Sequence, residues 1–449
     1  MSSMTKSRTT SIKRLYMPTD AEIRKGKIRE KTGKWLFLMI VASLFELIMF
    51  LNCIITSDEQ DRMGIGLLCG LYLIVQWIYF FVFSIIGKRR MELEIIGFLL
   101  SAVSITITAS ISPSKLLMQV ATTVVGIIVF AVMIWFLESI NRIVVMRLPV
   151  AAVALALLAL TLVLAEYTNG AKNWLYFGGI SVQPSELVKV AFVFVGAATL
   201  EKLQNTKSIW KYIIFALACV GMLFLMTDFG TALIFFATFL IIAFLRSGDI
   251  KTLFLICAAG LLGVVFILLY KPYVAARFST YRHIWENINE GGMQQTRTII
   301  YSLSGGFFGV GIGNGKLRHI FAAAEDLVFG VVCEEFGILL AFAIVLTYAF
   351  LLIYAIRQAK FARSSFYAIA GVAAAGLLVF QACLNVFGVN DLIPMTGVTL
   401  PFVSRGGSSM LCSWGLLAFI KAMDLRTYPN VMKELYHQKQ NLIRSAENE

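Results

Sequence analysis

Long apolar segments alternate with short polar ones along almost the whole chain. About twelve of these segments approach or exceed the roughly 18 residues that an α-helix needs to cross a bilayer. They lie at approximately 35–55, 65–87, 93–110, 116–138, 147–166, 186–203, 210–227, 229–246, 250–270, 327–356, 365–388 and 406–423. The pattern therefore predicts an all-α polytopic membrane protein with about twelve transmembrane helices.

Composition supports this class. The 449 residues are 59% hydrophobic and only 14% charged, and the mean hydropathy is +0.80. A soluble domain would carry about a quarter charged residues. The short alternating strands of an outer-membrane barrel are absent from the sequence.

The net charge of +13 follows the membrane topology rather than a nucleic-acid surface. Lys and Arg gather in the tails and in alternate short loops, which is the positive-inside pattern. We therefore expect a basic cytoplasmic tail at 1–34, a transmembrane domain at 35–425 and a cytoplasmic tail at 426–449. The large loop 271–326 is predicted on the outer side of the membrane, with both termini on the cytoplasmic side.

Cysteine and histidine give no sign of a disulfide or metal framework. The seven Cys lie mostly within apolar segments and lack zinc-ligand spacing, so we interpret them as small buried side chains. Three scattered His argue against a histidine metal centre.

Polar residues interrupt the apolar pattern most strongly between 271 and 337. Asp326, Glu334 and Glu335 enter the next apolar segment together, which is costly unless they are paired or functional. The preceding glycine-rich stretch allows close backbone approach. Its Lys316 is either a phosphate ligand or a solvated charge.

A second polar stretch covers residues 170–189. Pro184 and Ser185 indicate a helix start, with Ser185 as the expected cap. Glu186 and Lys189 are three residues apart, so they share a helix face and can pair within the membrane. A purely structural pair remains the alternative to a functional one.

Two further features lie at the predicted outer ends of helices. Asp228 either caps the helix that follows it or belongs to a site. Segment 390–409 is too apolar for a solvent loop and is broken by Pro394 and Pro401, which predicts a re-entrant segment buried in protein.

Several of these stretches together resemble the SEDS family (shape, elongation, division and sporulation proteins), which includes RodA, FtsW and SpoVE. The matching residues are Trp174…Gln183-Pro-Ser-Glu186-x-x-Lys189, Asp228-Phe-Gly-Thr231, Ser304-Gly-Gly-x-Phe-Gly-x-Gly311, Asp326-x-x-Phe329…Glu334-Glu335-x-Gly337 and Thr396-Gly-Val-x-Leu-Pro-Phe…Gly406-Gly-Ser-Ser409. The resemblance covers residues 165–425 well. It implies a ten-helix core, placed at 147–425, and two additional spans near the N-terminus.

The chain also departs from the family pattern. Met226-Thr227 replaces a Gln-Pro pair, and Lys172 stands where Arg is common. The usual Pro-Glu-x-His-Thr-Asp run is replaced by Ala322-Ala-Ala-Glu-Asp326, which loses the His. Arg405 stands where Tyr is usual.

The resemblance implies a peptidoglycan glycosyltransferase that polymerises lipid II outside the cytoplasmic membrane in cell shape, division or sporulation. It implies a class B penicillin-binding transpeptidase as partner, and it puts the family's essential Asp on Asp326, a positioned base for the acceptor hydroxyl. The expected substrate-binding residues are Lys172, Trp174, Gln183, Ser185, Glu186, Lys189, Asp228, Lys316, Glu334, Glu335, Thr396, Ser408 and Ser409. Lysines or a divalent cation, Mg or Mn, would neutralise the pyrophosphate leaving group.

Two other function classes remain. A lipid II flippase should carry polar residues through to the cytoplasmic side, whereas here they gather near the outer leaflet. A non-catalytic scaffold for division or sporulation proteins has no need of Asp326, Glu186 and Lys189.

The charge pattern generates a topology prediction. With the native cysteines replaced, Glu290→Cys should react with a membrane-impermeant maleimide in intact cells, because loop 271–326 is predicted outside. Labelling that occurs only after cell lysis would reverse the predicted orientation.

Overall fold

The computed structural model describes residues 33–85, 91–167, 170–178, 180–199, 207–248, 281–288, 292–424 and 427–428. Its helices are α3 (Gly33–Thr56), α4 (Glu59–Ile85), α5 (Glu92–Ile111), α6 (Leu116–Phe136), α7 (Ile140–Leu164), α8 (Pro184–Thr199), α9 (Lys207–Leu225), α10 (Phe229–Ser247), α13 (Met293–Ser304), α14 (Val328–Val331), α15 (Ile338–Ala359), α16 (Ser365–Val389) and α17 (Gly407–Met423). Short 3-10 turns at Pro113–Lys115 and Leu317–His319 and a π-helix at Val332–Phe336 complete the helical elements of this described part.

The predicted all-α membrane class is confirmed. Within the described residues, eight helices are long and apolar enough to cross a membrane: α3, α4, α5, α6, α7, α10, α15 and α16. The apolar helices α9 and α17 are shorter. Helices occupy eleven of the twelve predicted apolar segments, and the twelfth, 250–270, lies outside the described residues together with nearly all of both tails.

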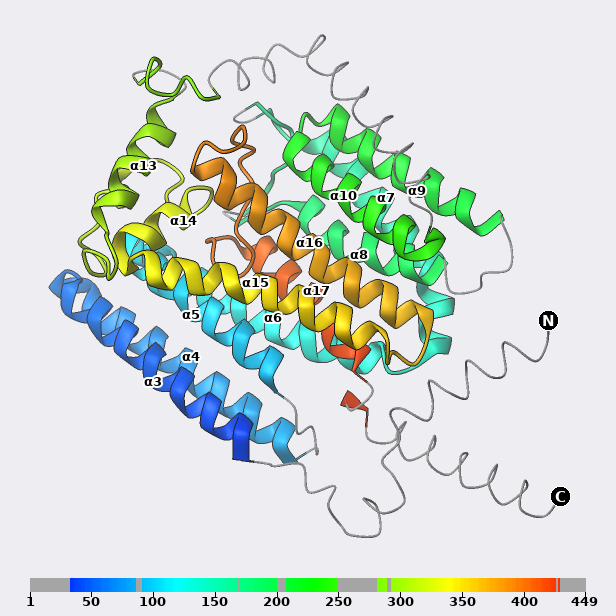
Figure 1. Ribbon diagram of the computed structural model, residues 1–449, viewed down its shortest axis with the longest axis horizontal. Helices are drawn as coiled ribbons and strands as arrows, with labels where there is room; N and C mark the ends of the chain where they lie inside the picture. The colour runs from blue at the N-terminus through cyan, green and yellow to red at the C-terminus, as the bar shows by residue number, and fades with distance from the viewer. Residues whose placement is uncertain are drawn as a thin grey trace.

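The bundle is organised around α5, α16 and α17. In α5 and α16, 83% and 72% of the most apolar window is buried, against 17% in α7. Figure 1 shows α3 and α4 side by side along one flank, with α9 and α10 on the opposite flank. Central helices are therefore covered on several sides, whereas peripheral helices expose apolar faces suited to lipid.

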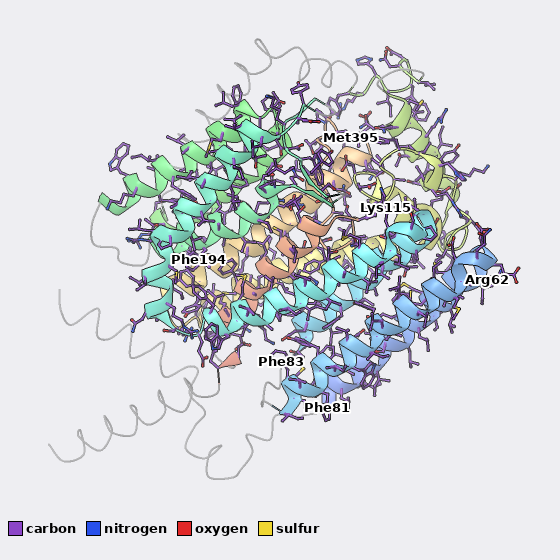
Figure 2. All side chains as sticks on the ribbon, turned by 180° about the vertical axis from the view of Figure 1, so that it is seen from behind. Arg62, Phe81, Phe83, Lys115, Phe194 and Met395 are labelled. Atoms are coloured by element: carbon purple, nitrogen blue, oxygen red, sulfur yellow. The ribbon has the colours of Figure 1, made fainter. Side chains whose placement is uncertain are left out.

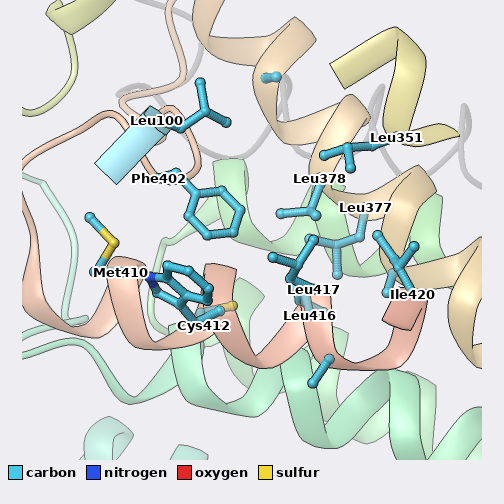
Figure 3. Packing of buried hydrophobic residues seen from close by; sticks show 14 of the residues in the cluster. Leu100, Leu351, Leu377, Leu378, Phe402, Met410, Cys412, Leu416, Leu417 and Ile420 are labelled. Carbon is cyan, nitrogen blue, oxygen red and sulfur yellow. The ribbon is translucent and has the colours of Figure 1, made fainter. Parts of the chain in front are cut away.

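Side chains of α15, α16 and α17 interlock in the core. Leu377 and Leu378 of α16 are buried with Leu416 and Leu417 of α17 and with Leu351 of α15 (Figure 3). Trp414 is fully buried and meets Phe98, Phe130 and Phe402 edge-on, with ring centroids 5.2–5.6 Å apart. Edge-to-face packing of this kind fixes the rotation of α17 relative to α5 and α6.

Segment 327–356 corrects the sequence analysis, which predicted one continuous span. The chain instead forms α14 and the π-helix, then breaks at Gly337, and the spanning helix begins at Ile338. Gly337 has a φ of 84°, and a Cβ there would lie 2.4 Å from the Phe307 carbonyl oxygen, so only glycine fits. Asp326, Glu334 and Glu335 therefore do not enter one continuous helix together, because all three precede the spanning helix.

Loop 271–326 is structured in its described parts. It contains α13 and the 3-10 turn at Leu317–His319, and it packs against the π-helix. The only β-sheet in the described residues is a small hairpin before α8, in which β1 (Leu175–Phe177) pairs antiparallel with β2 (Ile180–Val182). The loop leads into α14 and the hairpin leads into α8, so each lies next to a helix start where polar residues gather.

Close packing around Trp414 generates a stability prediction. A Cβ on Gly126 would lie 2.7 Å from the Trp414 Cδ1 atom, and the enclosed indole has no space to move. Gly126→Ala should therefore destabilise the purified protein by about 1–3 kcal/mol, measured as a lower thermal unfolding midpoint in detergent.

The matched control is Gly221→Ala on α9, where the added Cβ would meet no group within 4 Å other than the backbone of its own helix and its chain neighbours. Since alanine favours a helix over glycine, this variant should unfold at the same temperature as the parent or higher. Equal midpoints for Gly126→Ala and the parent would contradict the packing argument.

Candidate active site

The polar end of the bundle is built around segment 390–406, which links α16 to α17 without regular helix. Figure 2 places Met395 of this segment toward the same end of the bundle as Lys115 and Arg62, away from Phe81, Phe83 and Phe194. Residues 400–404 are buried, so this part of the segment lies within protein as predicted for a re-entrant segment, whereas Leu392 near its start is 56% exposed.

Asp326 lies in a tight turn that begins at Ala322. Its backbone N–H donates to the Ala322 carbonyl oxygen at 3.0 Å, and Ala322 has a φ of 60°. Asp326 is partly exposed, and its Oδ2 lies 3.4 Å from the point where a Cβ would stand on Gly397. The turn therefore presents the carboxylate beside the re-entrant segment.

Two amides of α16 tie this segment in place. Asn385 Nδ2 donates to the Asp326 carbonyl oxygen at 2.9 Å and to the Val398 carbonyl oxygen at 2.8 Å. Gln381 Nε2 donates to the carbonyl and hydroxyl oxygens of Thr399 at 2.9 and 3.1 Å. Neither residue was among the predicted site residues, although two amides four apart in an apolar helix are a recognisable signal.

The predicted pairing of Glu186 with Lys189 is present. Lys189 Nζ donates to Glu186 Oε1 at 2.7 Å and to Gln381 Oε1 at 2.8 Å. The side chains are only 1% and 6% exposed for Lys189 and Glu186. The ammonium is thus enclosed between α8 and α16, without the open face that a pyrophosphate ligand needs.

The serines and threonines of the predicted site extend this network. Thr399 Oγ1 lies 2.8 Å from Ser409 Oγ in the first turn of α17. Ser408 is buried beside it. Thr396 packs on the first turn of α10, since a Cβ on Gly230 would lie 3.0 Å from the Thr396 carbonyl oxygen. These contacts connect α10, α16 and α17 through the re-entrant segment.

Asp228 has the capping role that sequence analysis weighed against function. Its Oδ1 accepts the Thr231 N–H at 3.2 Å, and its Oδ2 accepts the side-chain amides of Asn173 and Gln183, each at 3.2 Å. The carboxylate therefore starts α10 and fastens the chain on both sides of the β-hairpin.

The remaining predicted residues near α8 are less engaged. Helix α8 begins at Pro184, so Ser185 lies inside the first turn and is not the expected cap. Lys172 and Trp174 are half-buried, and the Lys172 backbone N–H donates to the Met226 carbonyl oxygen at 2.9 Å.

Glu334, Glu335 and Lys316 form a second cluster, around loop 309–318. Glu334 accepts the backbone N–H groups of Lys316 and Leu317 at 2.7 and 2.9 Å, which caps the 3-10 turn, while the Lys316 side chain is exposed. Glu335 accepts the Ser110 hydroxyl at 3.2 Å. These two glutamates hold the loop against the bundle.

The Glu335 carboxyl lies before the spanning helix and is 1% exposed. Burial raises its pKa from 4.5 to about 7, and the nearby Glu334 acts in the same direction. Hydrogen bonds from the Gly313 backbone and Ser110, and the charge of Arg318, oppose that rise.

Glu325 and Arg405 form an ion pair that sequence analysis did not anticipate. Arg405 Nε donates to Glu325 Oε1 at 3.0 Å, and Nη2 donates to the same oxygen. The pair joins the turn before Asp326 to the re-entrant segment.

A protein metal cage is not formed by the described residues. No three His, Cys, Asp or Glu side chains in that part of the chain gather closely enough to hold a metal ion.

Fold and site together define a helical integral membrane protein with a carboxylate-bearing polar site at one end of its bundle. The family model described as "cell cycle protein", named for FtsW, RodA and SpoVE, matches residues 89–428, and the chain belongs to this family. The resemblance found in the sequence is thereby confirmed. Helices α3 and α4 lie outside the match.

Curated relatives from several bacteria are similar over most of their length. Stage V sporulation protein E of Bacillus subtilis is 31% identical over 259 residues, which is 56% of this chain and 71% of the relative. A probable peptidoglycan glycosyltransferase FtsW of Tolumonas auensis is 30% identical, covering 60% and 73%. The peptidoglycan glycosyltransferase RodA of Mycobacterium leprae is 28% identical, covering 67% and 68%.

Solved structures share the fold. One chain, from a study of polymerization and crosslinking by a peptidoglycan synthase complex, superposes with a TM-score of 0.62 at 24% identity, covering 76% of this chain and 99% of that one. The rod shape determining protein RodA of Thermus thermophilus gives a TM-score of 0.55 at 23% identity, covering 76% and 98%.

The buried pair generates a prediction. Lys189→Met leaves the Glu186 carboxylate buried without its cation, which should cost about 3–5 kcal/mol of stability. Adding Glu186→Gln removes both charges, so the double variant should regain most of the lost thermal stability in detergent.

Activity of the double variant then separates two roles. Recovered stability without polymerisation of lipid II would assign Lys189 a role in the reaction. Recovered stability with recovered polymerisation would make the pair structural, as its enclosure favours. A double variant no more stable than Lys189→Met would contradict the pairing argument.

Proposed function

We propose that this protein is a peptidoglycan glycosyltransferase that polymerises lipid II at the outer face of the cytoplasmic membrane. Family membership supports the proposal, since relatives from the family are named as peptidoglycan glycosyltransferases. Those relatives include a stage V sporulation protein E, a RodA and an FtsW, and each is 28–31% identical to this chain. The proposal therefore spans elongation, division and sporulation.

One observation carries the assignment of Asp326 as the catalytic residue. Glu186, Asp228, Glu334 and Glu335 are buried and engaged in capping or pairing. Asp326 differs because it is partly exposed at the polar end and lies on a turn whose backbone is fixed. A positioned and accessible carboxylate is what a general base requires.

The proposed reaction is a glycosyl transfer. The acceptor sugar hydroxyl attacks the anomeric carbon of the donor, a new C–O bond forms, and the bond from that carbon to the pyrophosphate oxygen breaks. Asp326 takes the hydroxyl proton, and the polyprenyl pyrophosphate leaves as an anion. Lys172 is half-buried and Lys316 is exposed, so both are more accessible to this anion than the enclosed Lys189.

A divalent cation remains part of the proposal in a limited form. Mg²⁺ is usually held by one or two carboxylates together with substrate phosphates. Since the described residues form no three-ligand cage, most ligands for Mg²⁺ or Mn²⁺ would come from the pyrophosphate and water.

The polyprenyl chain requires an apolar path. A cavity of about 380 Å³ between α7 and α8 is lined by apolar side chains. Its α8 wall includes Leu187 and Val188, next to Glu186. We assign the polyprenyl chain to this groove, because it lies along the helix that carries the buried ion pair.

Orientation and partner belong to the same proposal. Both termini are cytoplasmic, so the polar end faces outward, where lipid II is polymerised. A class B penicillin-binding transpeptidase is the proposed partner. The similarity to a chain described with a peptidoglycan synthase complex supports that choice.

Asp326→Asn tests the proposal. The side chain keeps its size but loses its basic charge, so polymerisation of lipid II by the purified protein should fall to background. The variant should stay folded, because the Asn385 hydrogen bond that holds the turn is made to the Asp326 backbone. Thermal unfolding of the purified variant checks this.

The matched control is Asp391→Asn, the same chemical change at the end of α16. Asp391 Oδ1 accepts the Arg282 N–H at 3.4 Å, and an amide oxygen can still accept it. This variant should polymerise normally. Polymerisation by Asp326→Asn would remove Asp326 from the mechanism, whereas lipid II transport without polymerisation by the parent protein would favour a flippase.

A further inference from the structure

The turn that carries Asp326 is held by three consecutive carbonyl oxygens. The Ala324 oxygen accepts the Arg405 N–H at 2.8 Å, and the Glu325 oxygen accepts the Ser404 hydroxyl. The Asp326 oxygen accepts Asn385 Nδ2 at 2.9 Å. Two of these three donors come from Ser404 and Arg405, so the re-entrant segment fixes where the turn lies.

Residues 404–406 are themselves anchored to the bundle. The Ser404 carbonyl oxygen accepts the Ser104 hydroxyl of α5 at 3.4 Å. On the other side of Arg405, the Gly406 N–H donates to Gln119 Oε1 of α6 at 3.2 Å. Gln119 Nε2 in turn donates to Ser104 Oγ at 2.9 Å. Arg405 therefore extends from a rigid base.

The Arg405 side chain adds a charged link between this base and the turn. Both Nε and Nη2 converge on Glu325 Oε1, and the side chains are 14% and 33% exposed for Arg405 and Glu325. Partly exposed pairs contribute little to stability. The pair instead acts on Asp326, the residue that follows Glu325, through the position of its carboxylate and the net charge beside it.

Charge balance matters because Glu325 and Asp326 are adjacent in the chain. Two neighbouring carboxylates disfavour each other's ionised form, and an arginine on one of them offsets that effect. Two groups that approach Asp326 among the described residues, Asn385 of α16 and Gly397 of the re-entrant segment, are uncharged. Both members of the pair stand where this chain departs from the family pattern, Glu325 in place of Thr and Arg405 in place of Tyr.

We propose that Glu325 and Arg405 are positioning residues, whose ion pair holds the Asp326 carboxylate in place and balances the charge beside it. The inference rests on the proposed function and extends it to residues outside the family motif. Neither residue takes part in bond making. Asp326 remains the group that accepts the proton.

The test compares Arg405→Gln, Glu325→Gln and the double variant in lipid II polymerisation by the purified full-length protein. Each single change should lower kcat about tenfold or more, since small displacements of a reacting group have large effects, and should leave KM nearly unchanged. If the two residues act as one unit, the double variant should be no slower than the slower single variant. Multiplied losses would overturn the proposal.

A pH profile gives the readout that a purely structural role would not move. Arg405→Gln leaves the Glu325 charge uncompensated, so the acidic limb of kcat/KM should shift to higher pH. Glu325→Gln leaves the Arg405 cation, so that limb should shift to lower pH. The double variant should return it toward the parent. Shifts in the same direction, or none, would overturn the proposal.

Two further variants keep the test decisive. Arg405→Lys keeps the charge but loses the planar fork, so it should lower kcat without moving the acidic limb. Full kcat in Arg405→Lys would overturn the positioning role even where Arg405→Gln fails to fold. Glu286→Gln is the control, because it breaks an exposed pair with His283 in the same loop and should leave kcat unchanged.

The outcomes separate this inference from the proposed function. A parent protein that does not polymerise lipid II, or an active Asp326→Asn, overturns both. Parent-like kcat and pH profile in Arg405→Gln, with Asp326→Asn inactive, overturns the positioning role alone.

Discussion

Segment 390–406 imposes the constraint on which the rest of the polar end depends. A non-helical backbone inside a membrane protein cannot rely on water, so its N–H and C=O groups need partners from the protein. Here Gln381 and Asn385 of α16 satisfy the carbonyls of Thr399 and Val398, and Ser404 Oγ accepts the Leu400 N–H at 2.8 Å. Satisfying this backbone brings α16 and the Asp326 turn together.

Acidic residues at this end are divided between holding the structure and carrying chemistry. Glu186 and Lys189 neutralise each other in the interior, and Asp228 and Glu334 accept backbone N–H groups at the start of helical turns. Each arrangement meets the cost of burying a charge with a cation or with donors. Asp326 is placed differently, because its backbone is tied down while the residue stays partly exposed.

Much of the fold could be predicted from the sequence, because spanning helices follow directly from long apolar segments. The Glu186–Lys189 pair was also predictable, since spacing of three residues places both on one helix face. Local periodicity could not show the break at Gly337, because it exists only where Phe307 and Gly309 pack into it. The same limit applies to Glu325 and Arg405, which are 80 residues apart and meet only in the folded chain.

The roles of Lys189 and Asp228 show a further limit. The sequence shows which charged side chains are costly to bury, but not whether each one contacts a neighbouring side chain or a substrate. For Lys189 the answer depends on Gln381, and for Asp228 it depends on Asn173 and Gln183. Neither answer can be obtained without knowing which helices are adjacent.

Helices α3 and α4 have a consequence for how other molecules reach this protein. They lie outside the family match and cover α5 and α6, and their connecting turn reaches the loop at Gly313, where a Cβ would lie 3.0 Å from Thr56 Oγ1. This flank of the perimeter is therefore occupied by the chain's own helices. A lipid or a partner's transmembrane helix that diffuses in the membrane must therefore reach α5 and α6 from another side.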